Sequence, residues 1–273
     1  MKKYPIIISD FDGTLACDDG SISEKNASAI KKYTQQGGIF AICTGRMMNS
    51  IKPHAERLGL NGLLVAYQGA QILDMNSGEF LRDERLSVQQ ALEICVEMEK
   101  HNLHIHVYNG DEFYTNSQDE LLRYYENICK VKGTIIEGRL SDFIKENNIQ
   151  PQKIIVLVMP EDKDLILNKL SDKLSANYYI TASASILVEV AKYGCEKSTG
   201  VKFIANYYGV PLENIIAIGD NLNDLTMIET AGLGIAVGNA EEKLKKSAKE
   251  VCEYTNNENA VAYIIEKYGL GEK

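Results

Sequence analysis

The sequence predicts an α/β protein with a doubly wound parallel sheet as its core and a smaller α+β module inserted into that core. Toward both ends of the chain, short apolar runs alternate with segments of helical periodicity, which is typical of a parallel sheet covered by helices. Between about residues 84 and 192, helical stretches alternate with paired strands instead. We therefore expect a core of residues 1–83 and 193–273 and an inserted module of residues 84–192.

The core elements follow from the apolar runs and the signals that end them. Ser23 is a typical N-cap, and the pair Gly37–Gly38 ends the helix that it begins. In the amino-terminal part we expect, in order, a strand at 4–9, a helix at 23–36, a strand at 39–43, a helix ending near 58 and a strand at 63–66. In the carboxyl-terminal part we expect a helix at 198–208 and strands at 215–218 and 234–237, each strand followed by a helix.

The inserted module combines helices with hairpins. Helices are expected at 88–100, 117–129 and 160–174, and strands at 104–108 and 112–115. The Asn109–Gly110 dipeptide between the two strands is a strong hairpin signal. This mixture predicts an α+β module.

Composition and charge exclude several classes of partner. With 45% hydrophobic residues among 273, the chain can bury a real core, and its net charge of -9 argues against nucleic acid or an anionic membrane as the main ligand. The apolar run after Lys2 and Lys3 is too short for a signal peptide, and no segment approaches a transmembrane span. The six cysteines include no Cys-x-x-Cys pair, which is typical of reduced thiols. We expect a cytoplasmic protein.

The stretch D-F-D-G-T-L at residues 10–15 directly follows the first apolar run. A period of two projects Asp10 and Asp12 to the same side, at the sheet edge where open α/β proteins build active sites. Because two adjacent carboxylates repel each other, Mg²⁺ is their natural partner: it takes oxygen ligands and is often shared with substrate phosphate. The alternative is an ordinary strand end with a solvated Asp-x-Asp turn.

Three further positions carry reactive residue types at strand or helix ends. Thr44 follows the second strand, Lys197 precedes a helix, and the segment 220–224 carries Asp220, Asn223 and Asp224. In this order the four positions resemble the four motifs of the haloacid dehalogenase (HAD) superfamily. The inserted module is similar to the large α/β cap (type IIB) of its Cof-type phosphatases. The resemblance covers nearly the whole chain and implies a Rossmann-like core with a cap domain.

The resemblance implies a role for each acidic residue. Asp10 would be the nucleophile that forms an aspartyl-phosphate, and Asp12 would be the general acid on the leaving oxygen and then the general base on water. Asp10, the backbone carbonyl of Asp12 and Asp220 would hold Mg²⁺. Asp224 would support this site from behind and orient Lys197.

A second set of residues is implied to hold the phosphoryl oxygens. It comprises Phe11, the Thr44 hydroxyl, the amides of Gly45 and Arg46, the Lys197 ammonium, and Asn223. Lysine would act there as a compact point charge.

Each assignment has a simpler alternative. Thr44 could cap the helix that follows it, and Lys197 could be one solvated lysine among 29 Lys and Arg. Asp220 and Asp224 could instead pair with the helix amino terminus near Leu222. Four acids in one crevice would destabilise one another without a cation, so the metal site explains more.

Two departures from the family pattern stand out. The family often has an asparagine before Gly-Ala after the third strand, whereas this chain has Gln68–Gly69–Ala70, a difference that concerns substrate positioning and not the chemistry. Phe11 stands where related transport ATPases have a lysine, and no transmembrane segment exists, which excludes ion pumping.

The inserted module carries polar residues that we expect to contact substrate. His101, His104 and His106 suggest zinc, but no cysteine or carboxylate completes a four-ligand set. The period of two places His104, His106 and Tyr108 on one exposed strand face. Glu189, within an apolar strand, is expected on the same substrate-facing side, the alternative being a solvated face or a satisfied ion pair.

Together these residues predict a Mg²⁺-dependent phosphatase that acts on a small phosphorylated metabolite, such as a sugar phosphate or a similar monoester. One alternative is a phosphomutase on the same scaffold, which the release of inorganic phosphate would distinguish. The other is a non-catalytic phosphometabolite-binding protein, which is disfavoured because the reactive side chains of all four motifs are intact.

Overall fold

The computed structural model describes residues 3–129 and 131–271, which form two compact units. The first, here called the core unit, contains the chain up to Gly45, Lys52–Arg82 and the chain from Glu196 onward. The second, the inserted unit, contains Asp83–Cys195 together with the short segment Arg46–Ile51.

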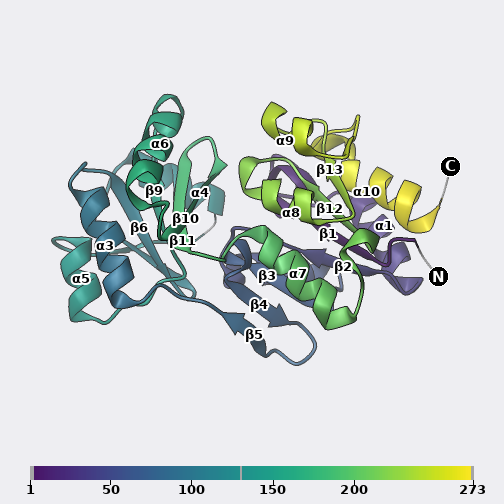
Figure 1. The fold of residues 1–273 in the computed structure, drawn as a ribbon, viewed down its shortest axis with the longest axis horizontal. Coiled ribbons are helices and arrows are strands. Elements are labelled where there is room, and N and C mark those ends of the chain that lie inside the picture. The colour runs from purple at the N-terminus through teal and green to yellow at the C-terminus, as the bar shows by residue number, and fades with distance from the viewer. Residues whose placement is uncertain (1–2, 130, 272–273) are drawn as a thin grey trace. The chain divides into compact units, whose positions relative to one another are not determined.

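A five-stranded parallel sheet forms the centre of the core unit, in the order β14-β13-β12-β1-β2 (Figure 1). Its strands are β1 (Ile6–Ser9), β2 (Ile39–Ile42), β12 (Ile215–Gly219), β13 (Leu233–Ala236) and β14 (Glu250–Val251). Ile6 of β1 pairs in parallel with Ile215 of β12 on one side and with Ile39 of β2 on the other. The predicted parallel core sheet is confirmed.

Helices of the core sequence connect these strands or follow the last of them. They are α1 (Glu24–Gln35), α2 (Met48–Arg57), α7 (Lys197–Tyr208), α8 (Leu225–Thr230), α9 (Glu242–Ser247) and α10 (Ala260–Ile264). The Ser23 side chain accepts a 3.1 Å hydrogen bond from Asn26 N at the start of α1, so its predicted N-cap role is confirmed. α1 packs against α10, and α7 packs against α8.

A small second sheet adjoins the end of β2. It contains β3 (Leu63–Ala66), β4 (Gln71–Asp74) and β5 (Phe80–Asp83), and β3 pairs antiparallel with β4. A parallel bridge between Cys43 and Val65 joins it to the core sheet. The sequence predicts β3, which is an unbroken apolar run, but not β4 and β5, which combine apolar with polar or charged residues.

The inserted unit is built on a six-stranded sheet in the order β10-β11-β9-β6-β7-β8. Its strands are β6 (His104–Asn109), β7 (Glu112–Thr115), β8 (Thr134–Ile135), β9 (Lys153–Leu157), β10 (Tyr178–Ala184) and β11 (Leu187–Lys192). Its helices are α3 (Val88–Glu99), α4 (Glu120–Cys129), α5 (Leu140–Glu146) and α6 (Lys163–Leu174). The predicted β6–β7 hairpin is confirmed, with Asn109 paired to Glu112.

One face of this sheet forms a hydrophobic core with α3, α5 and α6. Val107, Ile154 and Val188 come from the sheet, and Ile94 and Leu170 come from the helices. The sequence predicts a helix at 160–174, but residues 160–162 form a separate short turn before α6 begins.

Among the described residues, no helix combines the length and the apolar character needed to span a membrane.

Candidate active site

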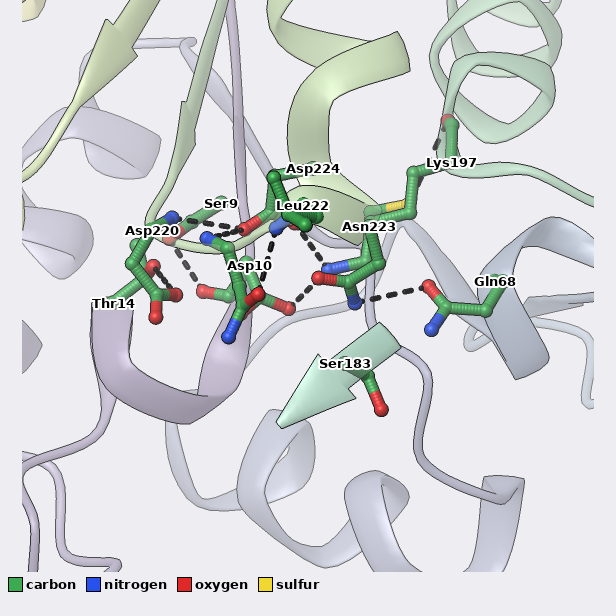
Figure 2. Close-up of polar contacts among 12 residues, drawn as sticks. Ser9, Asp10, Thr14, Gln68, Ser183, Lys197, Asp220, Leu222, Asn223 and Asp224 are labelled. Atoms are coloured by element: carbon green, nitrogen blue, oxygen red, sulfur yellow. Dashed lines mark hydrogen bonds and ion pairs between the residues drawn. The ribbon is translucent and has the colours of Figure 1, made fainter. Parts of the chain in front are cut away.

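The candidate site forms where the parallel strands β1, β2 and β12 end. Asp10 follows β1, Thr44 lies just beyond β2, and Asp220 follows β12. The backbone fixes this edge, since Asp10 N donates to Ile218 O at 2.9 Å and Cys43 N donates to Ser9 O at 2.9 Å. The carboxyl ends of parallel strands meet at one edge of a sheet, so residues far apart in sequence come together there (Figure 2).

Lys197, the first residue of α7, lies between two carboxylates in Figure 2. Its ammonium donates at 2.5 Å to Asp10 Oδ1 and at 2.5 Å to Asp224 Oδ1, and its side chain is 0% exposed. Burial alone would lower the pKa of Lys197, but the charges of Asp10 and Asp224 outweigh it and raise that pKa. The alternative of a solvated surface lysine is therefore wrong.

Both carboxylate oxygens of Asp224 accept hydrogen bonds. While Oδ1 accepts from Lys197, Oδ2 accepts from the amides of Asp220 at 2.8 Å and Asn221 at 3.0 Å. This carboxylate also forms a capping box with Asn221, as the alternative helix-terminus role for Asp224 predicted. Asp224 thus fixes the loop after β12 and holds Lys197 in place.

Asp10 and Asp220 complete a tight acidic cluster. One oxygen from each of Asp10, Asp220 and Asp224 lies within 4.8 Å of the others. Burial raises the pKa of Asp10 well above its usual value; Lys197 opposes this shift and the neighbouring acids add to it. Burial, and then the charge of Asp224, raises the pKa of Asp220 to about 7. The cluster without a cation is electrostatically unfavourable.

The donor set fits a hard cation. Lys197 Nζ donates to Asp10 Oδ1, and the Thr14 hydroxyl donates to Asp220 Oδ1 at 2.7 Å. The Oδ2 atoms of Asp10 and Asp220 accept no hydrogen bond from a described residue. A Cβ at Gly13 would lie 2.5 Å from Asp220 Oδ2, so only glycine leaves this space open. Within residues 3–129 and 131–271, no other group of three or more His, Cys, Asp or Glu side chains is close enough to hold an ion. Buried carboxylate oxygens are the ligands that Mg²⁺ prefers.

Thr44 lies on the other side of the site. Thr44 N donates to Val65 O, and Thr44 O accepts from Gln68 N, each at 3.0 Å. Because α2 begins only at Met48, Thr44 is not its N-cap, and that alternative is wrong.

Gln68 is a site residue that the sequence marked only as a departure from the family pattern. Its Oε1 accepts from Asn223 Nδ2 at 3.3 Å, and a Cβ at Gly45 would lie 2.5 Å from its Nε2. Tyr67 and Gln68 both have positive φ, 51° and 57°, a conformation that is costly for residues other than glycine and that clusters at active sites. The strained turn therefore places the Gln68 amide beside Asn223 and Gly45.

The other predicted phosphate-site residues are placed as follows. Phe11 is fully buried, with its ring 4.7 Å from that of His54. Arg46 belongs to the segment Arg46–Ile51 of the inserted unit, where its guanidinium donates to Ser50 Oγ at 3.4 Å. Asp12 is exposed.

In the inserted unit, the expectation of an exposed histidine face is wrong. His106 and Tyr108 are buried, and His106 stacks on Phe113 at a centroid distance of 4.5 Å. Tyr125 of α4 packs edge-on against His106, and His104 Nε2 lies 3.0 Å from His106 Nε2. The period of two identifies which residues share a face, but it does not show what covers that face.

Glu189 is likewise buried, at 2% exposure. Lys153 Nζ donates to Glu189 Oε2 at 2.8 Å, and the Ser183 hydroxyl donates to Oε1. The satisfied ion pair, the alternative at this position, is therefore correct, and the expected exposure is wrong.

Comparisons with known proteins identify the family. A family model described as haloacid dehalogenase-like hydrolase matches residues 7–265. A 5-amino-6-(5-phospho-D-ribitylamino)uracil phosphatase of Bacillus subtilis, YitU, is 31% identical over 275 residues, covering 98% of this chain and 99% of the relative. A second phosphatase of that name and organism, YcsE, is 28% identical over 268 residues, covering 97% and 96%.

A solved structure supports the same assignment. The crystal structure of a haloacid dehalogenase-like hydrolase from Bacteroides thetaiotaomicron matches with a TM-score of 0.81 and 27% identity, covering 97% of this chain and 99% of that one. With its parallel core sheet, its inserted mixed sheet and the Asp10–Lys197–Asp224 arrangement, the chain belongs to the haloacid dehalogenase-like hydrolase family, whose model matches residues 7–265.

Proposed function

We propose that this HAD-like phosphatase hydrolyses a small phosphorylated metabolite in a Mg²⁺-dependent reaction through an aspartyl-phosphate on Asp10. The observation that carries the proposal is the buried Lys197 ammonium, which bonds Asp10 and Asp224 at 2.5 Å beside Asp220. Lys197 favours the ionised form of Asp10, and the ionised form is the one that attacks phosphorus.

In the first step, an oxygen of the Asp10 carboxylate forms a bond to phosphorus as the ester P–O bond breaks. The electron pair of that bond goes to the leaving oxygen, which takes a proton from the Asp12 carboxyl. Proton transfer by a positioned side chain typically accelerates a reaction by about 10²- to 10⁴-fold. The products of this step are the free alcohol and the aspartyl-phosphate.

In the second step, the Asp12 carboxylate takes a proton from water, and the water oxygen attacks phosphorus. The bond between phosphorus and Asp10 breaks, its electron pair returns to the Asp10 carboxylate, and inorganic phosphate leaves. Asp12 is protonated again, so the cycle closes without another reactant.

The remaining motif residues bind the phosphoryl group and the metal. Asp10, Asp220 and the backbone carbonyl of Asp12 would hold Mg²⁺, which when bound would neutralise negative charge on the cluster and on the phosphoryl oxygens. The Thr44 hydroxyl, the Lys197 ammonium and Asn223 would hold the phosphoryl oxygens, together with Phe11 and the amides of Gly45 and Arg46.

The substrate class that we propose is a sugar phosphate or a similar monoester. Two relatives are named for a ribityl phosphate substrate, so a phosphorylated sugar alcohol belongs among the candidates. We do not propose His106, Tyr108 or Glu189 as substrate contacts, because the three side chains are buried within the inserted unit.

The test is an assay of phosphate release from a panel of phosphorylated metabolites, with Mg²⁺ and after exhaustive chelation. We expect release of inorganic phosphate from at least one sugar or sugar-alcohol phosphate, dependence on Mg²⁺, and loss of turnover in Asp10→Asn. Conversion of a substrate to its phosphate isomer without release would support the phosphomutase instead. Binding without turnover would support the phosphometabolite-binding alternative.

A further inference from the structure

Asparagine side chains from distant parts of the core unit hold the loop that follows Asp12. Three backbone carbonyls of this loop accept from asparagine amides: Gly13 O from Asn239 at 2.8 Å, Leu15 O from Asn26 at 3.2 Å, and Ala16 O from Asn256 at 3.0 Å. These bonds restrict the backbone of residues 13–16.

Asn239 makes the bond nearest to Asp12. Its Nδ2 donates to Gly13 O, and its Oδ1 accepts from Asn256 N at 2.9 Å. Because one partner is a carbonyl and the other is an N–H group, only one orientation of the Asn239 amide satisfies both. Asn239 is nevertheless exposed, so this is not a packing position.

The segment around Asn239 also contacts the second acidic loop. Val237 N donates to Gly219 O at 3.1 Å, and Glu241 N donates to Asp220 O at 2.8 Å. Residues 237–241 therefore bond both to the loop that carries Asp12 and to the loop that carries Asp220.

Asn256 holds the side chain of Asn239 through its backbone N–H. It is buried, and its Nδ2 also donates to Asp18 Oδ1 at 2.9 Å. These bonds hold Asn256 in place, and its backbone N–H, from which Asn239 Oδ1 accepts, therefore restricts the Asn239 side chain.

The position of Asp12 depends on this backbone. On one side of Asp12, the Asp10 amide is held by its bond to Ile218 O. On the other side, Gly13 has a φ of 72°, a backbone conformation that glycine adopts readily and other residues do not. Because Asp12 lies between these two bonded residues, the path of the backbone limits where its side chain can lie.

We propose that Asn239 is a positioning residue that holds Asp12 in place to protonate the leaving group. The inference rests on the proposed function, because it concerns the proton that Asp12 transfers in that reaction. Asn239 contacts neither Asp10 nor Lys197 and acts through the Gly13 carbonyl.

Asn239→Ala is tested by single-turnover rates on two substrates. The best sugar phosphate of the panel has an alkoxide leaving group that needs a proton, whereas p-nitrophenolate leaves without one. We expect about a tenfold loss for the sugar phosphate, since displacement of a catalytic group by a remote change can cost as much as a hundredfold, and little change for p-nitrophenyl phosphate. The Asn239→Ala effect should disappear in an Asp12→Ala background, because the two residues would act as one unit.

Two further variants sharpen the test. Asn239→Asp keeps the shape and the acceptor for Asn256 N but loses the donor to Gly13 O, so it should reproduce the selective loss even if Asn239→Ala folds poorly. Asn257→Ala is the control, because among residues 3–129 and 131–271 the Asn257 side chain bonds only to Asp18, further along the loop, and it should change neither rate.

Equal losses on both substrates, no loss, or a loss that persists without Asp12 would each overturn the inference. The proposed function fails separately, if the wild-type protein hydrolyses no phosphomonoester at all.

Discussion

At the scale of single residues, Lys197 determines whether the acidic cluster is stable. Its ammonium is fully buried and bonds both Asp10 and Asp224, so it compensates two charges that would otherwise repel in a region of low polarity. Removing one partner of a buried ion pair typically costs about 3–5 kcal/mol, because an uncompensated charge remains. Lys197 therefore has a structural role as well as its proposed role in phosphate binding.

Lys197→Met should lower the free energy of unfolding by about 3 kcal/mol or more, since the aliphatic stem is kept while the charge is lost. Urea denaturation of both proteins without divalent cations measures this difference. Lys202→Met on the same helix is the matched control, because Lys202 is exposed and its loss should cost little. Similar losses for the two variants would show that the buried pairs do not stabilise the fold.

Residues of this kind differ in how well the sequence predicts them. Asp10, Thr44, Lys197 and Asp220 follow strand ends or precede a helix, and that local position is visible in the chain. The bond between Gln68 and Asn223 joins residues 155 positions apart, so no local pattern indicates it.

At the scale of elements, the turn after β1 is shaped by one glycine. Gly13 has a φ of 72°, and a Cβ there would come within 2.5 Å of Asp220 Oδ2. The turn therefore needs glycine for its backbone conformation and also for the space beside a proposed metal ligand.

Gly13→Ala and Gly20→Ala form a matched pair that separates these two requirements. Both glycines have positive φ, 72° and 79°, but a Cβ at Gly20 meets nothing within 4 Å. Each substitution should cost about 1–2 kcal/mol of stability from backbone strain. Only Gly13→Ala should also raise the Mg²⁺ concentration needed for half-maximal activity. Equal Mg²⁺ dependence in both variants would contradict the proposed metal position.

The histidine pair of β6 predicts a pH effect on stability. Burial, together with the charges of His104 and Lys153, lowers the pKa of His106 well below its usual 6.5, and burial lowers that of His104 despite Asp119. At acidic pH the unfolded chain then binds protons that the folded chain does not. The contribution of these two histidines to stability should be complete above pH 6.5 and should be lost as the pH decreases below it.

His106→Phe keeps an aromatic ring on Phe113 and removes the titrating group. Wild-type stability should fall more steeply than that of the variant below pH 6.5, by up to about 1.4 kcal/mol per pH unit for one proton. Urea denaturation from pH 8 to pH 5 measures both slopes. Parallel curves would show that His106 takes up its proton equally in the folded and unfolded chain.

The sequence predicts long elements better than short ones. Ser23 and the Asn109–Gly110 turn define α1 and the β6–β7 hairpin, because capping and turn chemistry are local. β4, β5 and α5 were not predicted, because polar or charged residues interrupt their short apolar runs. The burial of His106 and Glu189 was also not predicted, because it depends on Tyr125 and Lys153, which come from other elements.

At the scale of the whole molecule, the residues proposed to hold Mg²⁺ lie in loops of the core unit. Asp10, Lys197 and Asp220 come from segments separated in sequence by the inserted unit, yet they meet at one edge of the core sheet. A ligand that binds only the folded cluster should therefore protect these loops selectively.

Hydrogen exchange with and without Mg²⁺ tests this localisation. We expect slower amide exchange in residues 10–15 and 219–224 and no change in the strands β6 and β9, because a bound cation stabilises only the loops that hold it. Asp220→Asn should abolish the protection. Protection spread over both units, or retained in Asp220→Asn, would place the cation elsewhere.

The central claim, catalysis through a phosphorylated Asp10, is tested most directly by trapping the intermediate. Asp12→Ala lacks the base of the second step, so during turnover of p-nitrophenyl phosphate the aspartyl-phosphate should accumulate. Acid quench followed by peptide mass spectrometry should find one phosphoryl group on the peptide that contains Asp10, and none in the Asp10→Asn/Asp12→Ala double variant. Release of p-nitrophenol without any phosphorylated peptide, or with the phosphoryl group on another residue, would contradict the account.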